Sequence, residues 1–217
     1  LSERATARGT KTKVHVKIDT GMGRVGFLPG YRAVKDVMRI SGLPGLVIEG
    51  IFTHFAVADE SGDEDAYTRR QFELFNNICM ELNRVGIYIP VKHVANSAAI
   101  LRFPEMHLDM VRAGIILYGL HPSGATQDCG IDLRPAMSLK ARITNVKEVE
   151  EGASISYGRT YRTDGRRKIA TISIGYADGY LRLLSNRAEA VIHGRLCPIR
   201  GRICMDQCMA DVTEMDT

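Results

Sequence analysis

Residues 14–27, VHVKIDTGMGRVGF, combine charged side chains with a glycine-rich turn. The alternation of apolar and polar residues in VHVKID predicts a strand. The two glycines in residues 20–23 predict a turn that approaches a ligand closely and offers free N–H groups to an anion. The charged side chains are Lys17, Asp19 and Arg24. They could hold a carboxylate or a phosphate, although spacing alone slightly favours an ordinary solvated turn, because Gly-x-Gly turns are common.

Polar residues also follow the next predicted strands. Strands are predicted over 14–19, 46–55 and 91–95, and helices over 31–41, 66–85 and 98–103. This alternation predicts parallel strands joined by crossover helices. The polar groups at the strand ends are His54, then Asn96 with Ser97, then Arg112 with Gly114. Ligands bind at the C-terminal edge of such sheets, although His54 and Asn96 could equally be satisfied caps.

The helix predicted over residues 66–85 carries an apolar stripe at helical spacing. Its members are Phe72, Phe75, Cys79 and Leu82. We interpret the stripe as core, not as a cofactor-binding face. Residues 1–12 are expected to be a surface helix or loop, and residues 115–120 are expected to be extended.

The pattern changes after residue 121. Short strands are predicted over 137–143, 144–149, 169–174, 188–192 and 203–212, without helical periodicity. The fold class predicted is α/β followed by β. The α/β domain spans residues 1–121, a linker spans 122–132, and a mainly-β domain of meander or barrel type spans 133–217.

The β domain carries three polar clusters around glycines: ISYGRTY from residue 155, SIGYADGY from residue 173 and GRICMDQ from residue 201. A free tyrosine has a pKa of about 10 and is a poor base unless cations favour the phenolate. Arginines are available nearby for that purpose. Taken singly, each cluster is explained as well by structural tyrosines that cap turns.

Composition limits the function classes. The chain has 217 residues and a net charge of +4, and its one basic cluster is three residues long. These values give little support to a nucleic-acid partner. No apolar run is long enough to span a membrane. Five cysteines without a C-x-x-C pair predict neither a disulfide framework nor a zinc site, and favour a reducing, cytoplasmic compartment.

Seven motifs, taken in order, closely resemble the alanine racemases, bacterial enzymes that use pyridoxal 5′-phosphate (PLP). The motifs are KIDTGMGRVGF, GIFTHFA, ANSAA, VRAGIILYGL, SYGRTY, IGYADGY and GRICMDQ. They extend from Lys17 to about Val212. The resemblance implies that residues 1–121 are the C-terminal portion of a (β/α)8 TIM-type barrel, followed by the mainly-β domain.

The resemblance implies roles for single residues. His54 resembles the histidine beside the cofactor ring, and Arg112 the arginine that faces the pyridine nitrogen. Ser97 resembles part of the phosphate cradle, together with the backbone of Gly114 and Ile115. The substrate carboxylate would be held by Arg24 and the backbone of Met205, and Lys17 resembles a lysine that is often carbamylated and positions that arginine.

The resemblance also implies a catalytic tyrosine, Tyr157. In this family one acid/base group is the PLP-binding lysine, and the other is this tyrosine, which reaches in from the second subunit of a homodimer. The entrance to the site would be lined by Asp59, Tyr176, Arg182, Arg202 and Asp206. The implied reaction is interconversion of L- and D-alanine, which supplies D-alanine for peptidoglycan.

One departure from the family pattern is large. The PLP-binding lysine of the family lies in a K-A-N-A-Y-G motif, which this sequence lacks. The lysines present are Lys11, Lys13, Lys17, Lys35, Lys92, Lys140, Lys147 and Lys168. We therefore expect a piece of a longer racemase, without the N-terminal lysine segment and the end of the β domain, that is inactive alone.

Two alternatives remain open at the level of sequence. One is a serine racemase domain of a glycopeptide-resistance protein, which shares these motifs. The other is a non-catalytic, PLP-binding or subunit-association role. A decarboxylase of the same barrel class fits less well, because an acidic residue is expected there in place of Arg112.

Overall fold

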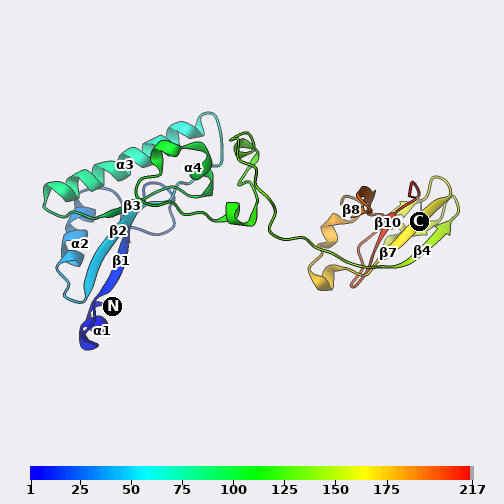
Figure 1. Cartoon of the computed structure of the whole chain (residues 1–217), viewed down its shortest axis with the longest axis horizontal. Coiled ribbons are helices and arrows are strands. Elements are labelled where there is room, and N and C mark those ends of the chain that lie inside the picture. The colour runs from blue at the N-terminus through cyan, green and yellow to red at the C-terminus, as the bar shows by residue number, and fades with distance from the viewer. Residues whose placement is uncertain (216–217) are drawn as a thin grey trace. The chain divides into compact units, whose positions relative to one another are not determined.

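The chain divides into two compact units, between Met137 and Ser138, in a computed structural model that describes residues 1–215. Each unit has its own sheet and its own apolar core (Figure 1). No helix in the described part of the chain has the length and apolar character needed to cross a membrane.

The first unit contains a three-stranded parallel sheet in the order β1-β2-β3. The strands are β1 (Thr12–Lys17), β2 (Leu46–Phe52) and β3 (Val91–His93), and the helices are α1 (Ser2–Ala7), α2 (Tyr31–Ser41), α3 (Glu64–Arg84) and α4 (Ser97–Arg102). The predicted alternation of strands and helices is confirmed. Helices α2 and α3 are the crossovers that parallel pairing requires.

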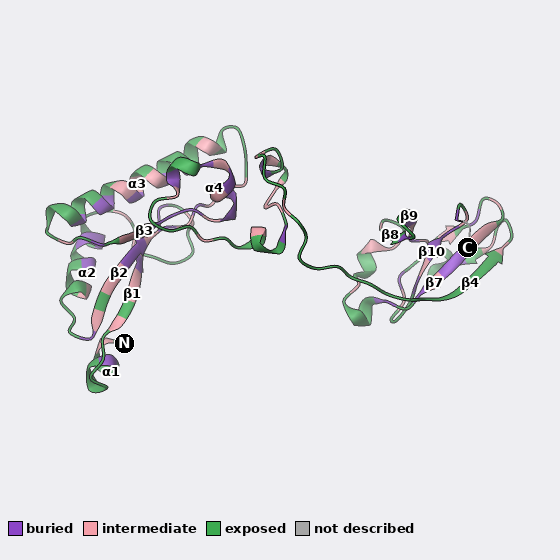
Figure 2. Ribbon diagram, viewed as in Figure 1, coloured by how far each residue is buried: buried purple, intermediate pink, exposed green. Residues whose placement is uncertain are grey.

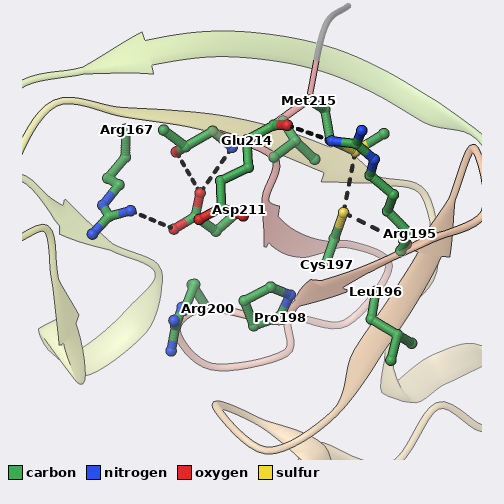
Figure 3. A pocket seen from close by; sticks show the side chains of 11 residues that line it. Arg167, Arg195, Leu196, Cys197, Pro198, Arg200, Asp211, Glu214 and Met215 are labelled. Atoms are coloured by element: carbon green, nitrogen blue, oxygen red, sulfur yellow. Dashed lines mark hydrogen bonds and ion pairs between the residues drawn. The ribbon is translucent and has the colours of Figure 1, made fainter.

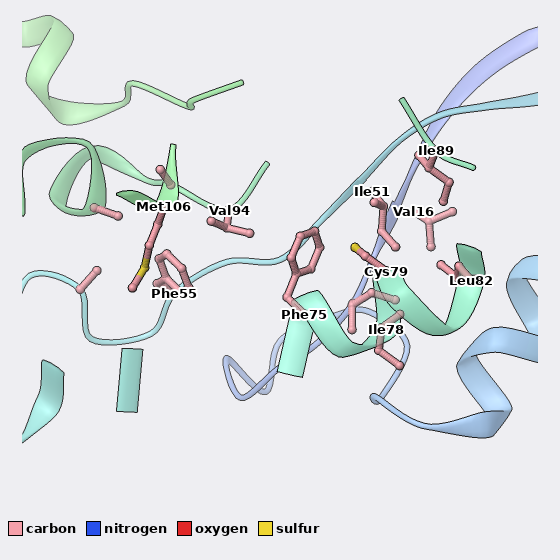
Figure 4. Close-up of a cluster of buried hydrophobic side chains, with 14 of the residues drawn as sticks. Val16, Ile51, Phe55, Phe75, Ile78, Cys79, Leu82, Ile89, Val94 and Met106 are labelled. Carbon is pink, nitrogen blue, oxygen red and sulfur yellow. The ribbon is translucent and has the colours of Figure 1, made fainter. Parts of the chain in front are cut away.

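The core of the first unit lies between the sheet and these crossover helices. Figure 4 shows Val16 of β1 and Ile51 of β2 meeting Phe75 and Leu82 of α3. Phe75, Cys79 and Leu82 are buried and Phe72 is partly buried, which confirms the predicted core stripe. The opposite face of α3 is exposed, as Figure 2 shows. The helix is therefore fixed against the sheet by its apolar face.

Two segments of the first unit differ from the sequence prediction. Residues 115–120, expected to be extended, contain a 3₁₀ helix at Ile115–Tyr118 that ends at Gly119 with a φ of 73°. The expected linker, residues 122–132, belongs to the first unit. The Ser123 hydroxyl donates to the carbonyl oxygen of Asp59, and Thr126 is fully buried. A polar composition suggested a linker, but local hydrogen bonds hold this segment in place.

The second unit is built from strands and short 3₁₀ turns in its described residues. β4 (Ile143–Val149), β7 (Arg167–Ile172) and β10 (Cys208–Asp211) form an antiparallel sheet in the order β10-β7-β4. Two hairpins accompany it: β5 (Ser154–Ile155) with β6 (Tyr161–Arg162), and β8 (Glu189–Ile192) with β9 (Arg195–Pro198). The β character predicted for this region is confirmed.

Two predicted strands of the second unit are wrong in extent. Residues 137–142 are not in a strand, because β4 begins only at Ile143. The strand predicted over 203–212 is restricted to β10, because the N–H of Cys204 donates to the carbonyl of Gln207 at 2.8 Å and closes a turn. That turn carries Met205 and Asp206, two of the predicted site residues.

Candidate functional site

Arg112 is the centre of a polar cluster in the first unit. Its Nη1 lies 2.7 Å from His93 Nδ1, and its Nη2 donates to the carbonyl of Thr53 at 2.9 Å and of Val94 at 3.2 Å. Nη2 also lies 3.3 Å from Nδ1 of His54. A guanidinium has donors only, so both histidine Nδ1 atoms must be acceptors. In their neutral forms, both rings therefore carry the proton on Nε2.

The electrostatics of the cluster agree with these tautomers. Burial, followed by the charges of Arg112, Arg24 and Lys17, lowers the pKa of His54 from 6.5 to about 4. Burial, Arg112 and His15 lower the pKa of His93 to about 4 as well. Both rings are therefore neutral near pH 7, beside a permanent cation.

Lys17 lies in the same field of positive charge. Its pKa is lowered by burial and by the nearby charges of Arg24 and Arg112, against an opposing effect of Asp19. Three cationic side chains from separate positions in the sequence therefore act on one region of the first unit. The predicted neighbourhood of Lys17, Arg24, His54 and Arg112 is supported by these interactions.

In the glycine turn after β1, the N–H groups of both glycines are used within the protein and are not free for an anion, which agrees with the ordinary turn that spacing alone slightly favoured. The N–H groups of Gly21 and Gly23 donate to Oδ1 of Asp19 at 3.1 and 3.0 Å. These bonds lower the pKa of Asp19 even though burial alone would raise it. Asp19 is thus the anion that the turn binds, and Arg24 is left exposed beyond it.

Ser97 and Gly114 form a small backbone-and-hydroxyl cradle at the start of α4. The N–H of Gly114 donates to the Ser97 hydroxyl oxygen at 2.8 Å, and a Cβ on Gly114 would lie only 3.3 Å from that oxygen. The Asn96 carboxamide caps the helix by accepting from the N–H of Ala99 at 3.0 Å. Ile115 follows and is exposed. The absence of a side chain on Gly114 leaves room for a small anionic group beside the hydroxyl.

Asp59 stands apart from this cluster. It lies in the turn after β2, where its carbonyl accepts the Ser123 hydroxyl. Among residues 1–215, no hydrogen bond or ion pair joins its carboxylate to Arg112 or its partners. The predicted entrance role of Asp59 has no geometric support within the first unit.

Sequence reasoning did not identify His15 and His93, which extend the Arg112 cluster. His15 Nδ1 lies 2.7 Å from His93 Nε2. Both residues lie on predicted strands, β1 and β3, and no spacing rule links positions 78 residues apart. No sequence signal distinguishes them, because both are ordinary polar residues of strands that also carry lysines.

In the second unit, a strained loop presents Tyr157 to solvent. Tyr157 is 68% exposed, and Ser156 before it has a φ of 64°, which a residue with a Cβ seldom adopts. The Ser156 hydroxyl donates to the carbonyl of Arg202 at 2.5 Å and holds this conformation. A Cβ on Gly158 would lie 3.0 Å from the guanidinium of Arg202. The loop that carries Tyr157 is therefore fixed against the loop that carries Arg202.

A third loop joins these two. The N–H of Tyr176 donates to the carbonyl of Cys204 at 3.0 Å, and that of Ala177 to the carbonyl of Met205 at 2.8 Å. Gly175 lies so close to both carbonyls that a Cβ there would overlap backbone atoms. The three glycine-rich clusters predicted from the sequence are thus brought together.

The remaining predicted residues of the second unit lie around this junction. The Ser185 hydroxyl donates to the carbonyl of Arg182 at 2.5 Å and accepts from the N–H of Ile203 at 3.0 Å. Arg182 and Arg202 line one shallow depression together with Ser185. Asp206 is exposed in the turn that follows Cys204. Arg202, and Arg182 with it, therefore lie beside the loop that carries Tyr157.

A separate pocket in the second unit contains none of the predicted site residues (Figure 3). Its charged groups pair within the pocket: Arg167 lies 3.9 Å from the buried carboxylate of Asp211, and Arg195 donates to the carbonyl of Glu214 at 2.9 Å. The guanidinium of Arg200 lies over the Tyr161 ring. Arg167, Arg195 and Arg200 each contact a group of the protein, so we interpret these contacts as structural, although Nε of Arg200 is buried without a hydrogen-bond partner among the described residues.

The sequence matches two family descriptions, "Alanine racemase, N-terminal domain" over residues 1–122 and "Alanine racemase, C-terminal domain" over residues 136–217. It is 48% identical over 216 residues to an alanine racemase of Clostridium perfringens and 51% identical over 208 residues to one of Methanococcus maripaludis. These matches cover 100% and 96% of this chain, but only 55% of each relative. The chain thus spans about half the length of these curated relatives.

Solved structures of alanine racemases resemble the whole chain. The structure of the alanine racemase of Clostridium difficile 630 has a TM-score of 0.87 and a sequence identity of 43%. The match covers 100% of this chain and 56% of that one. The structure of the alanine racemase of Streptomyces coelicolor has a TM-score of 0.88 and a sequence identity of 36%. That match covers 100% of this chain and 57% of the other.

Proposed function

The chain belongs to the alanine racemase family, and from this premise we propose that it supplies much of the cofactor and substrate site of a PLP-dependent alanine racemase. The reaction is the interconversion of L- and D-alanine, which provides D-alanine for peptidoglycan. The proposal rests above all on Arg112, which can only donate hydrogen bonds and is held between His54 and His93. In this proposal the parallel sheet of the first unit is part of a (β/α)8 barrel.

The groups around Arg112 fit PLP. Arg112 Nε donates to no acceptor among residues 1–215, so that N–H is available to the pyridine nitrogen of the cofactor. Ser97 with the backbone of Gly114 and Ile115 suits the phosphate, because the cradle has a hydroxyl and no side chain on Gly114. Neutral His54 suits a place beside the ring. Bound PLP supplies an electron-withdrawing ring that makes the Cα–H of an attached amino acid more acidic.

Arg112 limits how strongly that ring withdraws electrons. A guanidinium donates a hydrogen bond but does not give up its proton in proteins. A pyridine nitrogen that faced it would therefore stay unprotonated. Weaker electron withdrawal favours simple proton removal and return over side reactions, which suits a racemase.

Arg24 would hold the substrate carboxylate together with the backbone of Met205, and Lys17 would position Arg24. The pKa of Lys17 is lowered by burial and by neighbouring cations. The neutral amine is the form that reacts with CO₂, so this environment supports carbamylation of Lys17. A carbamate would replace a cation by an anion beside Arg24 and turn repulsion into attraction.

Tyr157 would be the acid/base group on one face of the substrate, and the PLP-binding lysine of the complete enzyme the group on the other. The exposed position of Tyr157 on a fixed loop suits delivery to the site of a partner subunit. We therefore propose a homodimer with shared active sites. Tyr176, Arg182, Arg202 and Asp206 would surround the entrance, and Asp59 is proposed there on the family pattern alone.

The proposal is tested by exchange of the α-hydrogen of L-alanine in D₂O with added PLP, followed by NMR. The chain is assayed alone and with a separately made N-terminal segment of a relative that carries the PLP-binding lysine. We expect exchange and D-alanine only in the second mixture. L-Serine in parallel distinguishes serine specificity.

Tyr157→Phe in the active mixture should abolish most of the exchange, whereas Tyr88→Phe, an exposed tyrosine of the first unit, should leave it unchanged. Exchange by the chain alone would contradict the proposed need for the lysine segment. No exchange in either mixture would favour a non-catalytic role.

A further inference from the structure

A continuous series of side chains runs from Arg112 across the sheet to the surface. Arg112 Nη1 lies 2.7 Å from His93 Nδ1, and His93 Nε2 lies 2.7 Å from His15 Nδ1. His15 Nε2 lies 3.6 Å from the carboxylate of Glu49, whose other oxygen accepts from Lys13 at 2.5 Å. The four groups Arg112, His93, His15 and Glu49 are called the relay below.

The direction of hydrogen-bond donation along the relay is fixed by chemistry. Arg112 can only donate, so His93 Nδ1 accepts and His93 Nε2 carries the proton. That proton is donated to His15 Nδ1, which leaves the His15 proton on Nε2, facing an anionic carboxylate. Any other tautomer would place two N–H groups against each other at 2.7 Å. Only one combination of histidine tautomers lets every member of the relay form its hydrogen bond or ion pair.

The sheet is built to accept the His15 ring. His15 is paired with Gly50 in the register of β1 with β2, next to an irregularity between Val14 and His15. A Cβ on Gly50 would overlap the His15 ring at Nδ1. On the other side, the His93 ring is stacked on Phe52, with centroids 4.8 Å apart and an angle of 4° between the planes. Arg112 also lies over Phe52.

We infer that His15 is a positioning residue for Arg112, acting through His93. With a partner on each ring nitrogen, His93 cannot rotate away from the guanidinium. His93 is buried, so without His15 its Nε2–H loses its acceptor, and the ring is held only from the Arg112 side. This inference rests on the proposed function of Arg112 and extends it to residues that do not reach the cofactor cradle.

The first test uses long-range ¹H–¹⁵N NMR of the full chain, which needs neither cofactor nor turnover. We expect His15, His54 and His93 all to show a protonated Nε2 and an unprotonated Nδ1. In His15→Leu, hydrogen exchange of the Arg112 guanidinium should accelerate about tenfold, because the bond to His93 is weakened by the order of one neutral hydrogen bond. His15→Asn should restore slow exchange, because its Oδ1 can replace the Nδ1 acceptor.

Gly50→Ala is an independent variant that displaces the His15 ring without removing it, and it should also speed the exchange. His107→Asn, a control histidine that contacts the carbonyl of Ile100, should leave the exchange unchanged. An Nδ1-protonated His93 in the wild type, or slow exchange in both His15→Leu and Gly50→Ala, would overturn the inference. If alanine exchange fails but these NMR results hold, the proposed function is wrong and the relay stands.

Discussion

The backbone nitrogen of Gly23 lies 3.0 Å from Oδ1 of Asp19, within the turn that follows β1. The same oxygen accepts from Gly21, so the turn is closed by the carboxylate of the second residue after β1. This internal anion explains why a glycine turn that resembles an anion-binding site is not one. It also fixes the path of the chain that leads to Arg24.

Asp19→Ala should destabilise the first unit by about 1–3 kcal/mol, because two backbone donors lose their acceptor. The free energy of unfolding in urea, followed by circular dichroism, measures this change. The pKa of Asp19 is lowered by the fold, so the stabilisation is present above the unfolded-state pKa and is lost as the pH falls through the folded-state value. Asp128→Ala, at an exposed position, is the control and should be neutral.

The first unit should lose stability between pH 6.5 and pH 4. His54 and His93 have their pKa lowered from 6.5 to about 4, so in this range the unfolded chain binds protons that the folded chain does not. Stability is therefore complete above the unfolded pKa and falls as the pH is lowered. Thermal unfolding across this range, together with NMR titration of both rings, measures the effect.

Arg112→Gln should raise the pKa of both histidines part of the way back towards 6.5. Burial is the larger cause of each shift and persists in the variant, whereas the charge of Arg112 is removed. NMR titration of the two rings measures the change. Unchanged values for both rings would contradict the electrostatic role assigned to Arg112.

Ser156→Ala and Ser156→Gly should differ in stability. Alanine keeps the strained φ of 64° and loses the hydroxyl bond to Arg202, so we expect a loss of about 1 kcal/mol. Glycine loses the same bond but relieves backbone strain worth about 1 kcal/mol, so its variant should be close to the wild type. Urea unfolding compares them, and equal stabilities would show that the strain is not significant.

Gly175→Ala should disrupt the junction of the three loops, because the added Cβ would overlap the carbonyl groups of Cys204 and Met205. We expect a loss of at least about 2 kcal/mol, as for other severe backbone conflicts. Gly165→Ala, where a Cβ meets nothing within 4 Å, is the matched control in the same unit. Equal unfolding midpoints for both variants would contradict the close packing at Gly175.

The sequence determined the class of the long helices and of the strands of the parallel sheet, and it supplied the candidate site residues. Periodicity identified α2 and α3 and the parallel strands between them, because apolar spacing reflects burial directly. The ordered motifs identified the family and placed Arg112, His54 and Ser97 in one site. Strand ends were less well predicted, as in residues 203–207, where a turn replaced the expected strand.

Only the tertiary structure decided which polar groups partner one another. The Gly21 and Gly23 donors could serve a ligand or the protein, and Asp19 takes them. His15 and His93 are unremarkable in sequence, yet parallel pairing through β2 brings them within 2.7 Å. Hydrogen bonds depend on atom positions to within tenths of an ångström, and such positions are set by register and packing between segments far apart in the chain. Local sequence patterns carry no information on them.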